Sequence, residues 1–124
     1  MGVRVSMVSM GNGNYIRFHI GDDVIHTFGL PTYRRVKVFW GFSSSRGKVR
    51  IEKARTGGYL LCRLPRARQV YFTISKGAVP DGTRTERHGS TECQSRIIDD
   101  KLEIDLPDWF FMGAERGPML RIAE

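Results

Sequence analysis

Apolar residues occupy every second position in two runs near the start of the chain, from residue 3 to 7 and from residue 16 to 20. Between them lies Gly11-Asn12-Gly13. A period of two is typical of strands with one buried face, and glycine and asparagine tolerate the positive φ of tight turns. The pattern therefore predicts a β-hairpin over the first 20 residues.

The period changes in the next ten residues. Asp22 and Asp23 begin this segment, apolar residues stand at 24, 25 and 28, and Gly29 follows. This order predicts a two-turn helix with an aspartate as N-cap and Gly29 at the left-handed C′ position. Pro31 then prevents the helix from continuing.

Alternation returns in the rest of the chain and predicts further strands, separated by turn-rich segments. The predicted strands are 36–40, 48–52, 59–64, 70–74 and 101–105, with a loop at 41–47 and turns at 65–68 and 99–100. Residues 81–90 are polar and rich in turn formers, which predicts a mobile loop.

The order of elements repeats. The run 16–20 matches 70–74 at an offset of 54 residues, and 48–52 matches 101–105 at an offset of 53. A nearly constant offset indicates a duplicated unit. We therefore expect one mainly β domain over 1–112, with one or two short helices, built from units at about 3–54 and 58–107 and followed by a tail at 113–124.

The composition of the chain indicates which class of partner and which cellular compartment to expect. The 124 residues suffice for one core, and the formal charge of +7 attracts polyanions such as nucleic acid, although surplus arginine can also serve solubility alone. Cys62 and Cys93 lie in no metal or redox motif, which predicts free thiols in a reducing compartment. No signal peptide or membrane span is evident in the pattern, so we expect a cytoplasmic protein without a membrane partner.

The segment from Val3 to Lys53 resembles the AbrB-like swapped-hairpin family, which includes transition-state regulators and MazE-like antitoxins. The likeness lies in the order of parts: Arg4-Val5-Ser6-Met7, Gly11-Asn12-Gly13, Ile16-Arg17-Phe18-His19-Ile20, a short helix closing on Phe28-Gly29-Leu30, then Val36-Lys37-Val38 and Gly47-Lys48-Val49-Arg50-Ile51. The resemblance implies a swapped-hairpin or related small β-barrel, formed by a monomeric pseudo-dimer or a homodimer. It also implies a DNA-binding transcriptional regulator.

Double-stranded DNA would be contacted by lysines and arginines, because phosphates need cations and arginine reads base edges through its planar fork. Arg4 and Arg17 alternate with the apolar face of their strands and therefore point away from it. The full candidate set for nucleic-acid binding is Arg4, Arg17, Arg34, Arg35, Lys37, Arg63, Arg66 and Arg68.

A second function stays open, that of a protein-binding module. This would be an antitoxin-like or inhibitory protein of a phage, prophage or other mobile element that blocks a host nucleic-acid-handling complex. Its candidate partner-binding residues are Trp109, Phe110 and Phe111, because bulky apolar residues in a row seldom stay in water. The alternative for these residues is packing on the β domain itself.

No pattern favours catalysis. The histidines at 19, 26 and 88 have no spacing that unites them with cysteines or carboxylates as a metal site. Glu103 and Asp105 share a strand face, where opposing lysines or arginines are a more common arrangement than an acid–base pair. We therefore expect no enzyme, no catalytic residue, no metal and no cofactor.

Overall fold

The computed structural model describes residues 2–10, 13–30, 34–41, 45–63, 69–80, 83 and 87–111. Its elements, in chain order, are β1 (Val3–Met10), β2 (Gly13–Ile20), α1 (Asp22–Phe28), β3 (Arg35–Trp40), β4 (Lys48–Ala54), β5 (Tyr59–Leu60), β6 (Cys62–Arg63), β7 (Val70–Ser75), η3 (Lys76–Ala78), β8 (His88–Cys93), β9 (Ser95–Ile98), β10 (Lys101–Asp105) and η4 (Asp108–Phe111). The mainly β fold expected from the alternation is confirmed.

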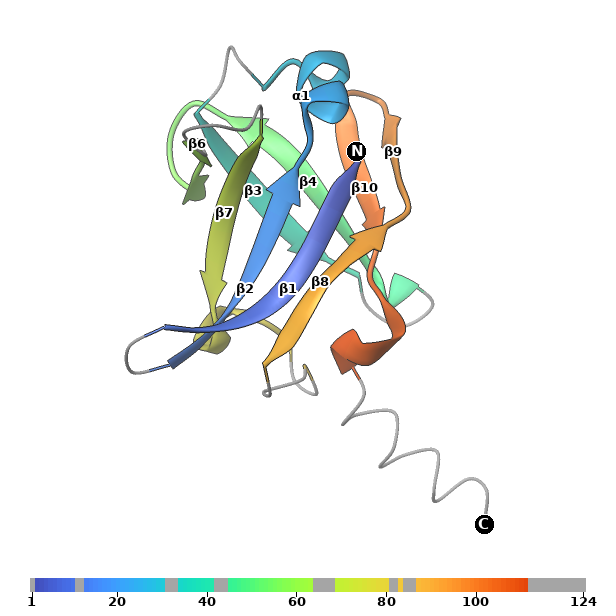
Figure 1. The fold of residues 1–124 in the computed structure, drawn as a ribbon. Coiled ribbons are helices and arrows are strands. Elements are labelled where there is room, and N and C mark those ends of the chain that lie inside the picture. The colour runs from blue at the N-terminus through green and yellow to red at the C-terminus, as the bar shows by residue number, and fades with distance from the viewer. Residues whose placement is uncertain are drawn as a thin grey trace.

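The strands form two antiparallel sheets that pack face to face (Figure 1). Sheet A has the order β6-β7-β2-β1-β8, and sheet B has the order β5-β3-β4-β10-β9. The chain passes from one sheet to the other within two short segments, at residue 61 between β5 and β6 and at residue 94 between β8 and β9. Bent strands that change sheet in this way make the corners of a sandwich.

The core lies between the sheets and is filled by the residues that the alternation placed on one face. Phe18 of β2 and Phe72 of β7 are fully buried and stack with their ring centroids 5.1 Å apart. The Tyr59 ring also stacks on Phe72, with the ring centroids 6.0 Å apart. The remaining core residues of the strands include Val3, Val5, Met7, Ile16, Ile20, Val36, Val49, Ile51, Val70, Ile74, Leu102 and Ile104.

The helix α1 covers one end of the sandwich (Figure 1) and inserts Ile25 and Phe28 into the core. Its C-terminus is as predicted, because Gly29 is left-handed at φ 81° and donates its N–H to the carbonyl of Ile25. The predicted N-cap is wrong. The N-cap is Gly21 without a side-chain hydrogen bond, and the Asp23 carboxylate instead accepts the backbone N–H of Gly2.

No helix in the described part of the chain is both long and apolar enough to span a bilayer.

In two antiparallel strand pairs, the central residue of one strand lies directly opposite the residue that matches it in the other predicted unit. Phe18 pairs with Phe72 across β2 and β7, at the offset of 54 residues. Arg50 pairs with Glu103 across β4 and β10, at the offset of 53. An approximate two-fold relation between the units would produce these registers. The division into units 3–54 and 58–107 stays a prediction.

The predicted loop at 81–90 is wrong at its end, because β8 begins at His88. This strand pairs with β1, with Cys93 opposite Val3 and Thr91 opposite Val5. Its sequence, HGSTEC, has no apolar alternation that would have predicted a strand.

Candidate nucleic-acid interface

The predicted DNA-binding cations do not form one surface. Arg4 and Arg17 lie on the outer face of sheet A, because their neighbours in β1 and β2 fill the core. Arg35 and Lys37 flank the buried Val36 and therefore lie on the outer face of sheet B. Arg34 and Arg63 are exposed, before β3 and on the edge strand β6 respectively, whereas Arg66 and Arg68 lie outside the described residues.

The pairing of β1, β2 and β7 brings four polar side chains together on sheet A. Arg4 is opposite His19, and His19 is opposite Tyr71 on the next strand. The Arg17 guanidinium carbon lies 4.7 Å from the centroid of the Tyr71 ring, and the His19 ring lies 5.7 Å from it. We call Arg4, Arg17, His19 and Tyr71 the Arg4–Arg17 cluster.

The pKa of His19 reflects both its burial and the positive charges of the cluster. Burial lowers the pKa of this imidazole below its ordinary value, and the charges of Arg17 and then Arg4 lower the pKa further. The ring is therefore neutral at pH 7, and the two guanidiniums carry the positive charge of the cluster. A phosphate placed here would offset the charges of the two guanidiniums.

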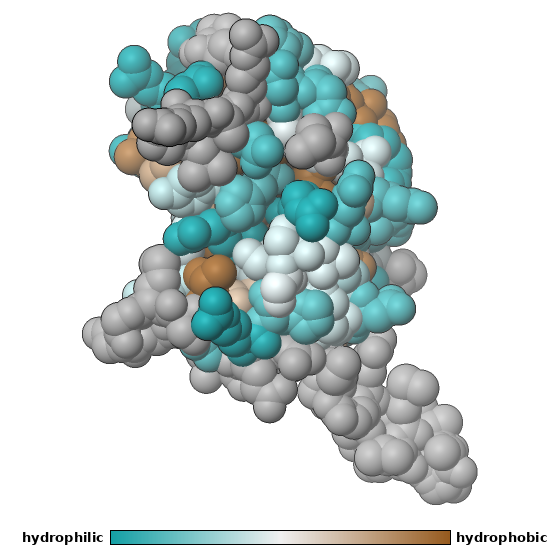
Figure 2. Space-filling view, in the orientation of Figure 1, coloured by the Kyte–Doolittle hydropathy of each residue, from teal (hydrophilic) through white to brown (hydrophobic). Residues whose placement is uncertain are grey.

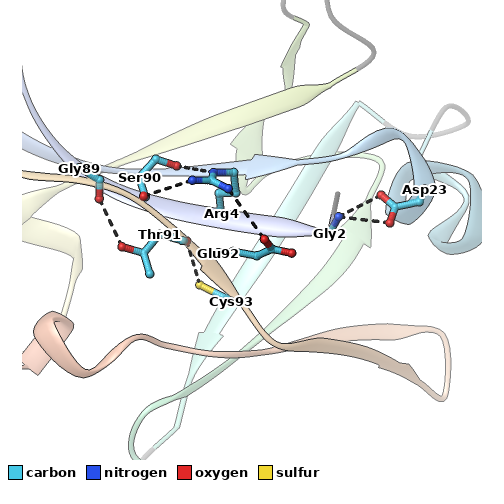
Figure 3. A network of polar contacts seen from close by, with 8 residues as sticks. All are labelled: Gly2, Arg4, Asp23, Gly89, Ser90, Thr91, Glu92 and Cys93. Carbon is cyan, nitrogen blue, oxygen red and sulfur yellow. Dashed lines mark hydrogen bonds and ion pairs between the residues drawn. The ribbon is translucent and has the colours of Figure 1, made fainter.

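Arg4 is oriented by the edge strand β8 (Figure 3). Its Nε donates to Ser90 Oγ at 2.7 Å and its Nη2 donates to the Ser90 carbonyl oxygen at 3.3 Å. Glu92 Oε1 lies 3.9 Å from Nη1, in a pair exposed by 40% and 65%. A pair this exposed contributes little, so Glu92 can release Arg4 to a stronger anion at small cost.

The face of sheet A that carries the cluster is turned toward the viewer in Figure 2. Its centre is coloured mainly as hydrophilic or intermediate residues, with few hydrophobic ones. The cluster therefore lies on a polar sheet face. The aromatic rings of the cluster are those of Tyr71 and His19.

On sheet B, by contrast, lysines and arginines alternate with carboxylates. The ion pairs are Lys48–Asp105 at 3.0 Å, Arg50–Glu52 at 3.1 Å, Arg96–Glu103 at 3.1 Å and Arg96–Asp105 at 2.9 Å. The expectation that Glu103 and Asp105 oppose cations of neighbouring strands is confirmed. The paired charges cancel locally, so this part of sheet B adds little to the attraction of a polyanion.

The assignment of Trp109, Phe110 and Phe111 to a partner surface needs correction. Their exposed fractions are 7%, 0% and 7%, and all three belong to the core. Phe110 packs 5.8 Å from Trp40, and Trp109 Nε1 donates to Thr91 Oγ1 at 2.9 Å. The three side chains close the end of the sandwich near η4, so packing on the β domain is the alternative that the structure shows.

Neither cysteine forms a disulfide. Cys93 is buried, and its burial raises the pKa of the thiol to about 11. Cys62 is half-buried on the edge strand β6, opposite Tyr71. No group of three or more histidine, cysteine, aspartate or glutamate side chains that could hold a metal ion occurs within the ranges that the structure describes.

We expect Cys93 to resist alkylation in the folded protein. A thiol with this pKa is ionised in about one molecule per thousand at pH 8, and only the thiolate reacts. In a Cys62→Ser variant, iodoacetamide should label the protein slowly in buffer and quickly in urea, as followed by mass spectrometry. Equal labelling rates in the two conditions would show that Cys93 is not protected.

In comparisons with protein-family models, with curated proteins and with solved structures, nothing matches this chain.

Proposed function

We propose that the protein is a DNA-binding transcriptional regulator and that it contacts double-stranded DNA through the Arg4–Arg17 cluster. The observation that carries this proposal is the register of β1, β2 and β7, which collects two arginines, a histidine and a tyrosine on one face. Half-buried arginines with fixed orientation suit phosphate, because their planar donors bind it in two places without large loss of side-chain freedom.

The distribution of charge supports the same face. The excess of +7 over the whole chain has to lie somewhere on the surface, and on sheet B the cations paired above are offset by Glu52, Glu103 and Asp105. On sheet A, the carboxylate next to the cluster is Glu92, at 3.9 Å from Arg4. Arg4 thus faces an exposed carboxylate whose pairing is weak, which leaves its charge largely available to a phosphate.

The proposal includes the AbrB-like architecture in the form of one chain that completes an interleaved barrel as a pseudo-dimer. Two pairings between the predicted units support it. β1 of the first unit pairs with β8 of the second, and β3 of the first pairs with β5 of the second. Exchange of strands between units is what a swapped-hairpin arrangement requires.

The alternative function, an antitoxin-like or inhibitory protein-binding module, loses the feature that motivated it. Trp109, Phe110 and Phe111 lie in the core, where they cannot anchor a partner without unfolding of η4. Hot spots of protein interfaces are enriched in Trp, Tyr and Arg, but a side chain that is already buried in its own core has no surface left for a partner. The alternative therefore ranks second.

Fluorescence anisotropy with random DNA duplexes across a salt series tests the proposal. The wild-type protein should bind at low salt and weaken linearly with the logarithm of salt concentration. The double variant Arg4→Ala/Arg17→Ala should bind more weakly to every duplex and lower the salt slope by about 2, because each lost phosphate contact removes about 0.9.

The matched control is Arg35→Ala/Lys37→Ala, which removes the same charge from the outer face of sheet B. Its affinity and slope should stay close to those of the wild type. Equal losses in both double variants would mean that only net charge matters and would overturn the assignment to sheet A. No binding of the wild type to any duplex at low salt would reject DNA binding itself.

A further inference from the structure

A groove of about 340 Å³ lies on the outer face of sheet B, on the other side of the sandwich from the Arg4–Arg17 cluster. Its described walls come from the end of β3, the start of β4 and the middle of β10. The lining residues are Phe39, Trp40, Gly41, Ser45, Lys48, Val49, Arg50 and Glu103. This volume falls at the lower end of the range of about 300–1,000 Å³ that is usual for small-ligand sites.

One wall of the groove is aromatic. Phe39 is 42% exposed and lies opposite Arg50 of β4, whose guanidinium carbon is 5.2 Å from the centroid of its ring. The phenyl ring and the guanidinium plane both offer flat surfaces on which a planar ligand can stack.

A second wall is formed where the chain returns from β3 to β4. A Cβ atom on Gly41 would lie 2.0 Å from the carbonyl oxygen of Ser45, so only glycine allows this approach. The Gly41 N–H donates to the Lys48 carbonyl oxygen at 2.9 Å, which fixes the neck of the loop. The close approach of the Gly41 and Ser45 backbones thus forms a side wall of the groove next to the aromatic one.

The groove is lined by cationic hydrogen-bond donors and by an anionic acceptor. Lys48 and Arg50 supply donors, and their side chains are 45% and 49% exposed in pairs with Asp105 and Glu52. Glu103 supplies acceptor oxygens, one of which accepts from Arg96 Nε at 3.1 Å. A carboxylate can accept about four hydrogen bonds, so Glu103 retains capacity for a ligand. Exposed ion pairs such as these rearrange at little cost.

We propose that this groove binds a nucleobase. A base is flat and stacks on Phe39 and Arg50, its amino groups donate to Glu103, and its carbonyl and ring nitrogen acceptors take hydrogen bonds from Lys48. The balance of charge in the groove argues against a simple anion or cation and for a ligand that is neutral but rich in donors and acceptors. The base is that of a free nucleoside or nucleotide, or a base of a single strand. This site does not depend on the Arg4–Arg17 cluster.

Isothermal titration calorimetry of the full chain with adenosine, AMP and a short single-stranded oligo(dA) tests the proposal. At least one of these probes should bind the wild-type protein, and Phe39→Ala should weaken that binding about ten-fold or more, since stacking on one aromatic ring carries much of base affinity. Glu103→Gln should weaken it as well, because it exchanges an acceptor for a donor.

The matched control is Ile98→Ala, because Ile98 is a similarly exposed apolar residue of sheet B, at 48%, that does not line the groove. Binding of adenosine or AMP that Phe39→Ala weakens identifies a free nucleoside or nucleotide as the source. Binding of oligo(dA) alone with the same sensitivity identifies a base of a strand. Absence of binding by all three probes, or equal losses in Phe39→Ala and Ile98→Ala, overturns the proposal while leaving DNA binding by sheet A intact.

Discussion

Replacement of Phe110 by alanine should lower the free energy of unfolding by about 3–5 kcal/mol, because it empties a fully buried aromatic site. The ring is 0% exposed and packs against Phe111 at 4.9 Å, Trp40 at 5.8 Å and Trp109 at 5.9 Å. Such a cavity is surrounded by rigid side chains and cannot collapse fully. The expected loss is a large part of the stability of a domain of this size.

Urea unfolding followed by circular dichroism measures this change. Phe39→Ala is the matched control, because Phe39 is 42% exposed and its truncation should cost less than about 1 kcal/mol. If Phe110→Ala does not fold, Phe110→Leu, which leaves a smaller cavity, provides the measurement. A Phe110→Ala variant as stable as the wild type would return η4 to the role of an exposed partner-binding segment.

Gly58→Ala should destabilise the protein by at least about 2 kcal/mol more than Gly57→Ala, through overpacking against a backbone that cannot move aside. Gly58 has φ +66°, and a Cβ there would lie 2.2 Å from the carbonyl oxygen of Val36. Gly57 has a similar φ of +73°, but its nearest neighbour would be the Lys37 Cε at 3.8 Å. Both variants therefore carry the strain of a left-handed alanine, and only Gly58→Ala adds a clash.

The clash would separate β5 from β3, and this gives the prediction a local readout. The Leu61 N–H donates to the Arg34 carbonyl oxygen at 2.9 Å, at the point where the chain leaves sheet B. Its hydrogen exchange should accelerate strongly in Gly58→Ala and little in Gly57→Ala. Equal stability and equal exchange in the two variants would contradict the close approach of Gly58 to Val36.

Much of the fold could be predicted because many of its elements are encoded by patterns within a few neighbouring residues. The run from Ile16 to Ile20 alternates, and every apolar residue in it is buried in β2. Gly29 was predicted at the helix C-terminus because a left-handed residue is required there and glycine adopts it without strain. The N-cap was mispredicted because the Asp23 carboxylate accepts a hydrogen bond from the backbone N–H of Gly2, a residue distant in sequence.

The strand β8 could not be predicted for a related reason. Its segment HGSTEC has no periodic apolar residues, and its strand conformation depends on pairing with β1, on Ser90 as acceptor of Arg4 and on Thr91 as acceptor of Trp109. All of these partners are remote in the chain. Context of this kind overrides weak local propensity.

The candidate site was predicted only in part. Alternation correctly directed Arg4 and Arg17 away from the core, but it could not show that Tyr71 lies beside Arg17 or that Arg35 and Lys37 belong to the opposite sheet. The groove on sheet B was missed altogether, because it depends on the approach of Gly41 to Ser45 and on the pairing of Arg50 with Glu103.

The sequence by itself determined the mainly β character, the first hairpin, the helix that ends at Gly29 and, for the strands that alternate, the side that faces the core. These follow from periods of two or of 3.6 residues and from the conformational freedom of glycine, which act over a few residues. Only the tertiary structure decided which cations share a face and that Trp109, Phe110 and Phe111 fill the core. The physical reason is that strand order and register join residues far apart in the chain, and no local pattern encodes those pairings.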